Sequence, residues 1–243
     1  MNAEMTKETD METPKLVSRE EWTKARLELL AAEKEFTRQR DALTRRRMAM
    51  PWERVGKNYV FDTLEGPRTL VELFEGRRQL LVQHFMFGPG WKEGCKSCSF
   101  MADHADGMIA HLAQRDVSFV AVSRAPLDEI VPFRKRMGWK FEWVSSSGSD
   151  FNYDFRVSFS PEEVASGRLD YNYGKWPHAM EELPGISVFS RNDAGEVFHT
   201  YSAYGRGVEV MMGTYTMLDL VPKGRDEDQL EYSMAWLRHH DRY

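Results

Sequence analysis

The sequence predicts an α/β domain with a central, partly parallel β-sheet flanked by helices, and with extensions at both ends of the chain. Two patterns carry this prediction. Nearly continuous apolar runs, which are typical of strands buried on both faces, alternate along the chain with segments of helical periodicity. Later in the chain, a turn at residues 192–195 separates two strand-like runs, which indicates an antiparallel hairpin at one edge of the sheet.

The composition excludes several classes of protein. Of the 243 residues, 42% are hydrophobic and 29% are charged, as in globular proteins that bury a core. The formal charge is −5, so we expect neither nucleic acid nor a membrane surface as a partner. No window holds the roughly 18 apolar residues of a membrane span, and residues 1–14 lack the apolar stretch of a signal sequence. We therefore expect a cytoplasmic protein.

The N-terminal part of the chain predicts a tail followed by one long helix. Residues 1–15 have the composition of a disordered tail. Residues 16–50 predict an amphipathic helix that begins after Ser18 and runs to about Met48. We expect this helix to pack onto its own domain, with a homodimer contact as the alternative. Its apolar positions recur every seven residues, at Trp22, Leu29, Phe36 and Leu43.

Residues 51–222 predict the sheet domain, and residues 223–243 predict a charged C-terminal extension. In the extension we interpret His239 and His240 as part of a solvated terminus, because adjacent histidines on a helix point about 100° apart. The expected strands lie at 59–61, 80–87, 117–122, 141–144, 186–189 and 197–201. The expected helices lie at 70–74, 95–112, 126–137 and 208–220, with further helix starts at 161 and 178.

The chain has two cysteines, Cys95 and Cys98, in the loop between a predicted buried strand and a predicted helix. In a parallel sheet this is the edge where functional sites form. A helix N-terminus stabilises a thiolate, and Lys92 and Lys96 are expected to lower the thiol pKa in the same direction. Cys95, nearer the helix start, is the predicted nucleophile. Cys98 is one turn further along, so it is expected to attack the resulting mixed disulfide.

Two other interpretations of the cysteines remain. They can be ordinary small core residues, which requires their spacing and context to be coincidental. They can also bind zinc together with His104 and His111. On a continuous helix these two histidines are about 10 Å of rise apart, so they do not converge easily with the thiolates on one ion. We expect no metal and no cofactor.

Several motifs around the cysteines resemble one known family. They occupy residues 85–100 (FMFGPGWKEGCKSCSF), 122–127 (VSRAPL), 136–139 (RMGW), 148–155 (GSDFNYDF) and 219–225 (DLVPKGR). Over roughly residues 14–243 the chain resembles the DUF899 family of thioredoxin-like proteins, which are described as predicted dithiol-disulfide oxidoreductases. The resemblance implies a thioredoxin-like fold with a peroxiredoxin-like layout. It also implies a thiol or disulfide substrate, either a protein or a small molecule.

The resemblance adds one residue and leaves the reaction open. Thioredoxin-like folds carry a cis-proline before the strand that leads the final hairpin, and residues 183–189 resemble that pattern, so Pro184 is the candidate. It is alternatively an ordinary proline at a strand start. A thiol peroxidase is the alternative to disulfide exchange. Peroxiredoxins have Thr or Ser three residues before the peroxidatic cysteine, whereas this chain has Lys92 there, and this departure argues against peroxide reduction by the usual hydrogen-bond network. A non-catalytic redox-sensing or interaction module is the second alternative.

Three further residues lie near the predicted site. Arg124 follows a buried strand and is expected to hold a thiolate or an anionic substrate group, unless it forms only a loop salt bridge. Trp91 is expected either to shape the entrance to the site or to cover the core. His84 lies in the strand before the cysteines, where it is either a proton acceptor for Cys98 or a hydrogen-bonded core histidine.

Overall fold

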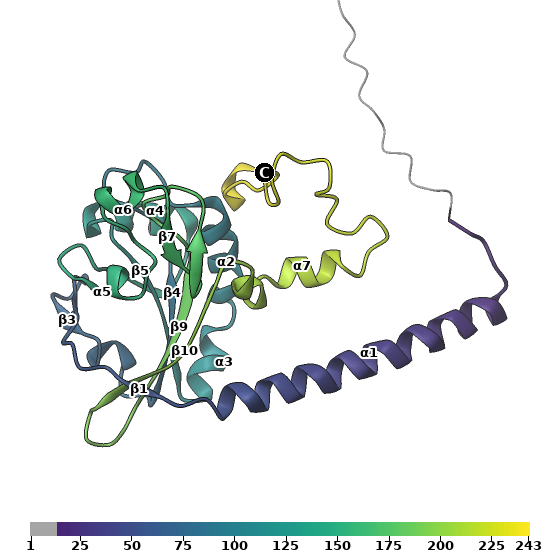
Figure 1. Cartoon of the computed structure of the whole chain (residues 1–243), viewed down its shortest axis with the longest axis horizontal. Helices are drawn as coiled ribbons and strands as arrows, with labels where there is room; N and C mark the ends of the chain where they lie inside the picture. The colour runs from purple at the N-terminus through teal and green to yellow at the C-terminus, as the bar shows by residue number, and fades with distance from the viewer. Residues whose placement is uncertain (1–13) are drawn as a thin grey trace, which may run out of the picture. The chain divides into compact units, whose positions relative to one another are not determined.

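The computed structural model describes residues 14–243 (Figure 1), so most of the predicted tail, residues 1–15, lies outside the described residues. By its internal contacts the chain divides into two compact units, which meet in the sequence after Met50. We describe the two units separately.

The N-terminal unit is helix α1 (Arg19–Met48), which confirms the predicted long helix. Ser18 caps its N-terminus: the Ser18 hydroxyl accepts from the backbone N–H of Glu21 at 3.2 Å, and the Glu21 carboxylate accepts from the backbone N–H of Ser18 at 2.9 Å. This reciprocal capping box satisfies two N–H groups that the helix leaves unpaired. Three arginines in the last turn face the negative end of the helix dipole. Packing of α1 onto its own domain, or onto a second copy, stays a prediction.

The C-terminal unit contains a six-stranded mixed sheet in the order β1-β10-β9-β4-β5-β6. Its strands are β1 (Glu53–Arg54), β4 (Gln79–His84), β5 (Val117–Ser123), β6 (Glu142–Ser145), β9 (Gly185–Arg191) and β10 (Val197–Tyr204). Strands β4, β5 and β6 are parallel, whereas β9 is antiparallel to both β4 and β10. The predicted hairpin is thus confirmed, and the arrangement is a thioredoxin-like fold.

The sheet is buried on both faces. Helices α2 (Lys96–Asp106), α3 (Ile109–Gln114) and α4 (Leu127–Met137) pack on one face, around a core that includes Phe85 and Phe133. The other face is covered by the hairpin of β2 (Val60–Phe61) and β3 (Arg68–Thr69), by η1 (Glu72–Phe74) and by α5 (Phe151–Asp154). This two-sided burial explains the nearly continuous apolar run at residues 80–87, of which residues 80–84 lie in β4 and residues 85–87 in the loop that follows it.

A smaller cluster is formed mainly by residues between β6 and β9. It includes α6 (Pro161–Ala165) and the hairpin of β7 (Leu169–Tyr171) and β8 (Gly174–Trp176). The hairpin turn has positive φ at both Asn172 and Tyr173, as its tight geometry requires. No helix begins at residue 178, so that expectation is wrong. The cluster buries Val157, Phe159, Leu169, Tyr171, Leu183 and Tyr204.

Two other helix predictions are wrong in their extent. The helix expected at 95–112 ends at Asp106, and α3 begins after Gly107 and Met108. The helix expected at 208–220 is a 3-10 helix, η2 (Gly205–Met211), followed by a short α7 (Gly213–Leu218). Glycines stand at both breaks, and glycine weakens a helix because its backbone loses the most entropy on ordering. A further short 3-10 helix, η3 (His240–Arg242), lies near the C-terminus.

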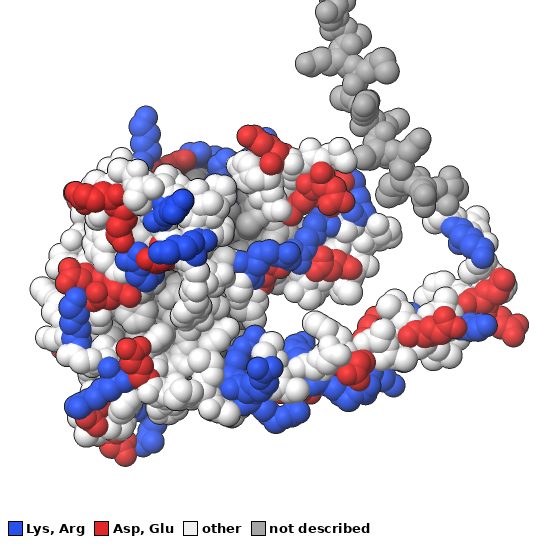
Figure 2. All heavy atoms as spheres, viewed as in Figure 1, with Lys and Arg blue, Asp and Glu red and all other residues white. Residues whose placement is uncertain are grey.

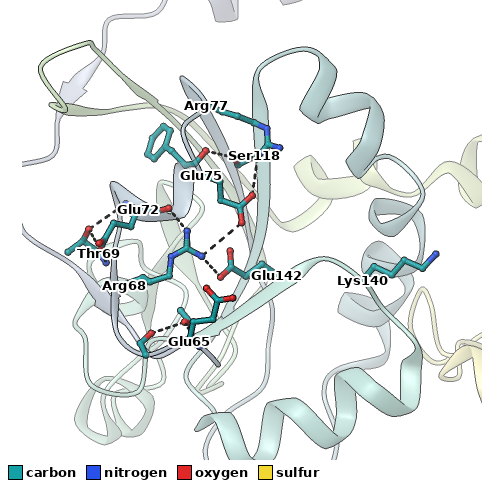
Figure 3. A network of polar contacts seen from close by, with 12 residues as sticks. Glu65, Arg68, Thr69, Glu72, Glu75, Arg77, Ser118, Lys140 and Glu142 are labelled. Carbon is teal, nitrogen blue, oxygen red and sulfur yellow. Dashed lines mark hydrogen bonds and ion pairs between the residues drawn. The ribbon is translucent and has the colours of Figure 1, made fainter.

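A polar network fastens η1 to the N-terminal ends of β5 and β6 (Figure 3). The Arg68 Nη1 atom lies 2.7 Å from Oε1 of Glu142, and the Arg77 Nη1 atom lies 2.9 Å from Oε2 of Glu75 and 3.2 Å from the Ser118 hydroxyl. These residues line a cavity of about 330 Å³. Because the cysteines follow the C-terminal end of β4, this cavity lies at the opposite end of the parallel strands.

The described residues give no sign of a membrane span. None of their helices combines the length and the apolar character that crossing a bilayer requires. Figure 2 shows basic and acidic side chains intermixed over the face in view, which is typical of a solvated surface. The expectation that the chain binds no nucleic acid stays a prediction.

Candidate active site

Cys95 and Cys98 lie where β4 leads into α2. Cys95 is the N-cap residue of α2, with φ −57° and ψ 134°. Its backbone N–H donates to the Met86 carbonyl at 3.0 Å, and the Met86 N–H donates to Sγ of Cys98 at 3.4 Å. Met86, in the loop after β4, therefore ties down both cysteine positions. This is the strand-to-helix turn that the sequence predicted.

The two thiols differ in their exposure to solvent. Cys95 is partly exposed, Cys98 is fully buried, and both are free. The Cys98 carbonyl accepts from Nε2 of Gln83 at 2.9 Å, which attaches the first turn of α2 to β4. The Cys95 carbonyl accepts from both the N–H and the hydroxyl of Ser99 at 2.9 Å. Of the two cysteines, Cys95 is therefore the more exposed residue.

The surroundings of Cys95 favour its thiolate. A hydrogen bond from the Cys98 thiol makes the largest contribution, and the backbone N–H groups of Cys98 and Ser97 and the Ser97 hydroxyl add to it. Burial opposes these donors. Together they lower the pKa of Cys95 from 9.0 to about 7. The donors belong to the first turn of α2, where backbone N–H groups have no partner within the helix.

The surroundings of Cys98 favour its protonated form. Burial raises the pKa of the Cys98 thiol, and its hydrogen bond to Cys95 and the negative charge of Cys95 raise it further. The Met86 N–H opposes this rise, whereas the charge of Glu182 adds to it. The pair thus contains one thiol that ionises readily and one that holds its proton. The roles predicted for them as nucleophile and resolving thiol stay predictions.

The lysines and the tryptophan beside the cysteines lie at the surface of the site. Lys92 and Lys96 are exposed, and the largest effects on the pKa of Cys95 come from hydrogen-bond donors and not from these two charges. Trp91 is half-buried and packs against the core that contains Cys98. Its ring also packs directly against Gly88: a Cβ atom added to Gly88 would lie 2.9 Å from the indole nitrogen of Trp91. A role for these residues in substrate binding stays a prediction.

Arg124 takes part in a buried ion pair. Its Nη2 atom lies 2.5 Å from Oε1 of Glu182, and its Nη1 donates to the Tyr153 hydroxyl at 2.5 Å. The Glu182 side chain is only 2% exposed, and its Oε2 accepts from the Ser158 hydroxyl at 2.6 Å. Burial raises the pKa of Glu182, and Arg124 opposes that rise. Arg124 therefore neutralises the Glu182 carboxylate, whose negative charge raises the pKa of Cys98.

Glu182 was missed by the sequence reasoning. The only local signal is that Glu182 stands directly before the apolar residues Leu183 to Ile186. An acidic side chain buried beside such a segment needs a partner of opposite charge. Its partner Arg124 is 58 residues away in the sequence.

Pro184 lies at the expected place but not in the expected conformation. It directly precedes β9, whose first residue, Gly185, pairs with His84 at the end of β4. The peptide bond before Pro184 is trans, so the expectation of a cis-proline is wrong. Its carbonyl accepts from the Tyr171 hydroxyl at 2.5 Å. The alternative interpretation, a proline at a strand start, agrees with this geometry.

The histidines weighed in the sequence have structural partners. His84 points to the sheet face opposite the cysteines, where its Nε2 lies 2.8 Å from the Ser187 hydroxyl and its ring stacks on Phe155. It is therefore the core histidine and not a proton acceptor for Cys98. His104 is held by the Phe100 carbonyl and by Thr214. Among residues 14–243, no group of three or more His, Cys, Asp or Glu side chains is arranged to hold a metal.

The C-terminal extension reaches the site, which the sequence did not predict. His239 is 2% exposed, and its Nε2 lies 2.9 Å from the Gly94 carbonyl, directly before Cys95. The interpretation of this segment as a solvated terminus is therefore wrong for His239. The burial of His239 cannot be recognised from the sequence, because the charged neighbours Asp241 and Arg242 suggest a solvated segment. In the structure both of them form ion pairs with the domain.

Comparison with solved structures returns peroxiredoxins and a putative thiol-disulfide oxidoreductase. The chain is similar to the peroxidoxin BcpB of Mycobacterium tuberculosis, with a TM-score of 0.46 and 13% identity over 67% of this chain and 93% of the other. A structure of peroxiredoxin Q of Xanthomonas campestris gives 0.45 and 12% over 68% and 91%. A putative thiol-disulfide oxidoreductase from Bacteroides vulgatus gives 0.39 and 8% over 65% and 92%.

Comparison with families gives a match over nearly the whole chain. No curated protein matches. The family model DUF899, described as a bacterial protein of unknown function, matches residues 11–243. This range contains both cysteines and both extensions. The chain therefore belongs to the DUF899 family.

Proposed function

We propose that this protein is a thiol-disulfide oxidoreductase in which Cys95 attacks a substrate disulfide and Cys98 resolves the mixed disulfide. The observation that supports the proposal is the unequal pair at the start of α2. Cys95 is partly exposed and its pKa is lowered to about 7, so about half of it is thiolate at neutral pH. Cys98 is buried next to it and protonated.

The exchange balances in two steps. In the first, the Cys95 thiolate attacks one sulfur of a substrate disulfide, a new S–S bond forms, and the other substrate sulfur leaves as a thiolate. In the second, Cys98 attacks the sulfur of Cys95, and the remaining substrate sulfur leaves as a thiolate. The proton of Cys98 passes to a departing thiolate. The substrate gains two electrons, and the Cys95–Cys98 pair is oxidised to a disulfide.

The first step also activates the second. Apart from burial, the main causes of the high pKa of Cys98 are its hydrogen bond to Cys95 and the negative charge of Cys95. Both disappear when Cys95 becomes part of a neutral mixed disulfide. The pKa of Cys98 then falls, although burial still raises it, and the resolving thiolate forms more readily once there is a bond to resolve. We place the reaction in the cytoplasm, where a thiol reductant returns the pair to its dithiol form.

Insulin reduction and peroxide consumption test the proposal with the full-length protein. We expect the wild type to accelerate the reduction of insulin disulfides by dithiothreitol, and C95S to give the uncatalysed rate. C98S should accumulate a mixed disulfide at Cys95, detectable by mass spectrometry. Consumption of hydrogen peroxide without insulin reduction would instead assign a thiol peroxidase. If the protein shows neither insulin reduction nor peroxide consumption, and the Cys95 thiol titrates near 9, the result would favour the non-catalytic module.

A further inference from the structure

We propose that His239, in the C-terminal extension, is a positioning residue that holds the peptide leading into Cys95. The inference rests on the proposed function, because it concerns the nucleophile assigned there. It also gives the C-terminal extension, residues 223–243, a role in the reaction.

The extension is fixed to the domain by apolar packing. Leu237 is 1% exposed and belongs to the same core cluster as Cys98. The Trp236 ring lies 6.0 Å from the ring of Phe100 in α2, nearly at a right angle. Its indole N–H donates to Oε1 of Glu227 at 2.6 Å. This packing fixes the position of His239, which lies two residues after Leu237.

His239 contacts the backbone directly before the nucleophile. Its Nε2 lies 2.9 Å from the Gly94 carbonyl, and its ring meets the ring of Phe133 edge to face at 5.3 Å. A carbonyl only accepts hydrogen bonds, so Nε2 carries the proton and donates. Gly94 is confined from the other side, since an added Cβ would lie 2.6 Å from the Phe85 ring. The Gly94 Cα is therefore packed against the core, while its carbonyl is bonded to His239.

Ion pairs hold the preceding residue in the same way. The Glu93 carboxylate contacts Arg136 of α4, and its Oε2 lies 2.9 Å from Nη1 of Arg242 in the extension. Arg136 also binds Asp241, with Nε 2.8 Å from Oδ2. The charge of Glu93 is thus compensated beside Cys95, and its side chain is anchored to both elements.

This support matters because the low pKa of Cys95 depends on backbone geometry. The N–H groups of Ser97 and Cys98, which lower this pKa, stay close to Cys95 only while Cys95 keeps its N-cap conformation, with φ −57° and ψ 134°. Release of the Gly94 carbonyl leaves the Gly94–Cys95 peptide held only by the bond from the Cys95 N–H to the Met86 carbonyl, so the peptide can tilt and the N–H groups move away from the thiolate. His239 therefore acts on the thiolate through the backbone, without touching a substrate.

The test measures the alkylation of Cys95 by iodoacetamide in the reduced, full-length protein from pH 5 to pH 10. We expect H239A to raise the pKa of Cys95 and to slow alkylation at pH 7 by about fivefold. This is the effect expected when the Cys95 thiolate loses one hydrogen-bond donor. H239Q should stay within about twofold of the wild type, because its amide N–H lies where Nε2 does. H240A is the matched control: this neighbouring histidine is exposed and binds Asp103.

Three results would overturn the inference: wild-type reactivity in H239A, an equal loss in H240A, or a loss in H239Q as large as in H239A. If circular dichroism shows H239A to be unfolded, the alkylation rates of H239Q and H239N test the inference instead. The shorter Asn side chain does not reach the Gly94 carbonyl, so equal rates in H239Q and H239N would contradict the positioning role. A wild-type Cys95 that titrates near 9 counts against the proposed function instead. The difference between the variants still reports on His239.

Discussion

The hydrogen bond from Cys98 to Cys95 makes a sharp prediction about two substitutions at one position. The pKa of Cys95 lies about 2 below its ordinary value of 9.0, which corresponds to about 2.7 kcal/mol in favour of the thiolate. The Cys98 thiol is the largest of the donors, and we assign it about half of this effect. C98A removes the donor, whereas C98S keeps a hydroxyl in its place. We therefore expect a Cys95 pKa of about 8 in C98A and of about 7 in C98S.

Alkylation rates followed against pH measure these values, with mass spectrometry to confirm that Cys95 is the labelled residue. At pH 7 the thiolate fraction falls from about a half to about a tenth in C98A, so alkylation slows about fivefold. Thermal unfolding of both variants controls for a general loss of structure. A C98A variant that titrates like the wild type would refute the reasoning. Equal rises in C98A and C98S would show that the low pKa needs the Cys98 sulfur itself and not a hydrogen-bond donor at this position.

Three further predictions concern the stability of the fold. G94A should lower the free energy of unfolding in urea by about 1–3 kcal/mol because the added methyl overlaps a core ring, whereas G56A, with open space around it, should change it little. E182Q should lower it by about 3 kcal/mol, because Arg124 loses its charged partner in a buried place; no change in the melting temperature would contradict this. Burial lowers the pKa of His84 from 6.5 to about 3, so the unfolded chain takes up a proton that the folded chain refuses. His84 therefore contributes stability above pH 6.5 that is lost as the pH falls toward 3, by about 1.4 kcal/mol per pH unit, and H84Q should remove this part of the slope in urea titrations.

Local patterns were enough to predict most of the secondary structure around the site. The nearly continuous apolar run at residues 80–87, whose first part lies in β4, the helical periodicity of α2 and the cysteines between them are features of neighbouring residues. They placed Cys95 at a helix N-terminus, where unpaired N–H groups favour a thiolate. The same kind of pattern predicted α1 from its capping serine and the parallel strands from their apolar character. Helix ends were less well predicted, because glycines broke two helices whose periodicity continued.

The sequence by itself determined that a strand, a turn and a helix present two cysteines of unequal position. Only the tertiary structure decided which distant residues act on them. Glu182 reaches Cys98 from the segment before β9, and His239 reaches Gly94 across 145 residues. The physical reason is that periodicity and capping report the preferences of neighbouring residues, whereas burial and charge pairing depend on which elements pack together. A polar run such as the one around His239 has the composition of a solvated terminus until its partners are known.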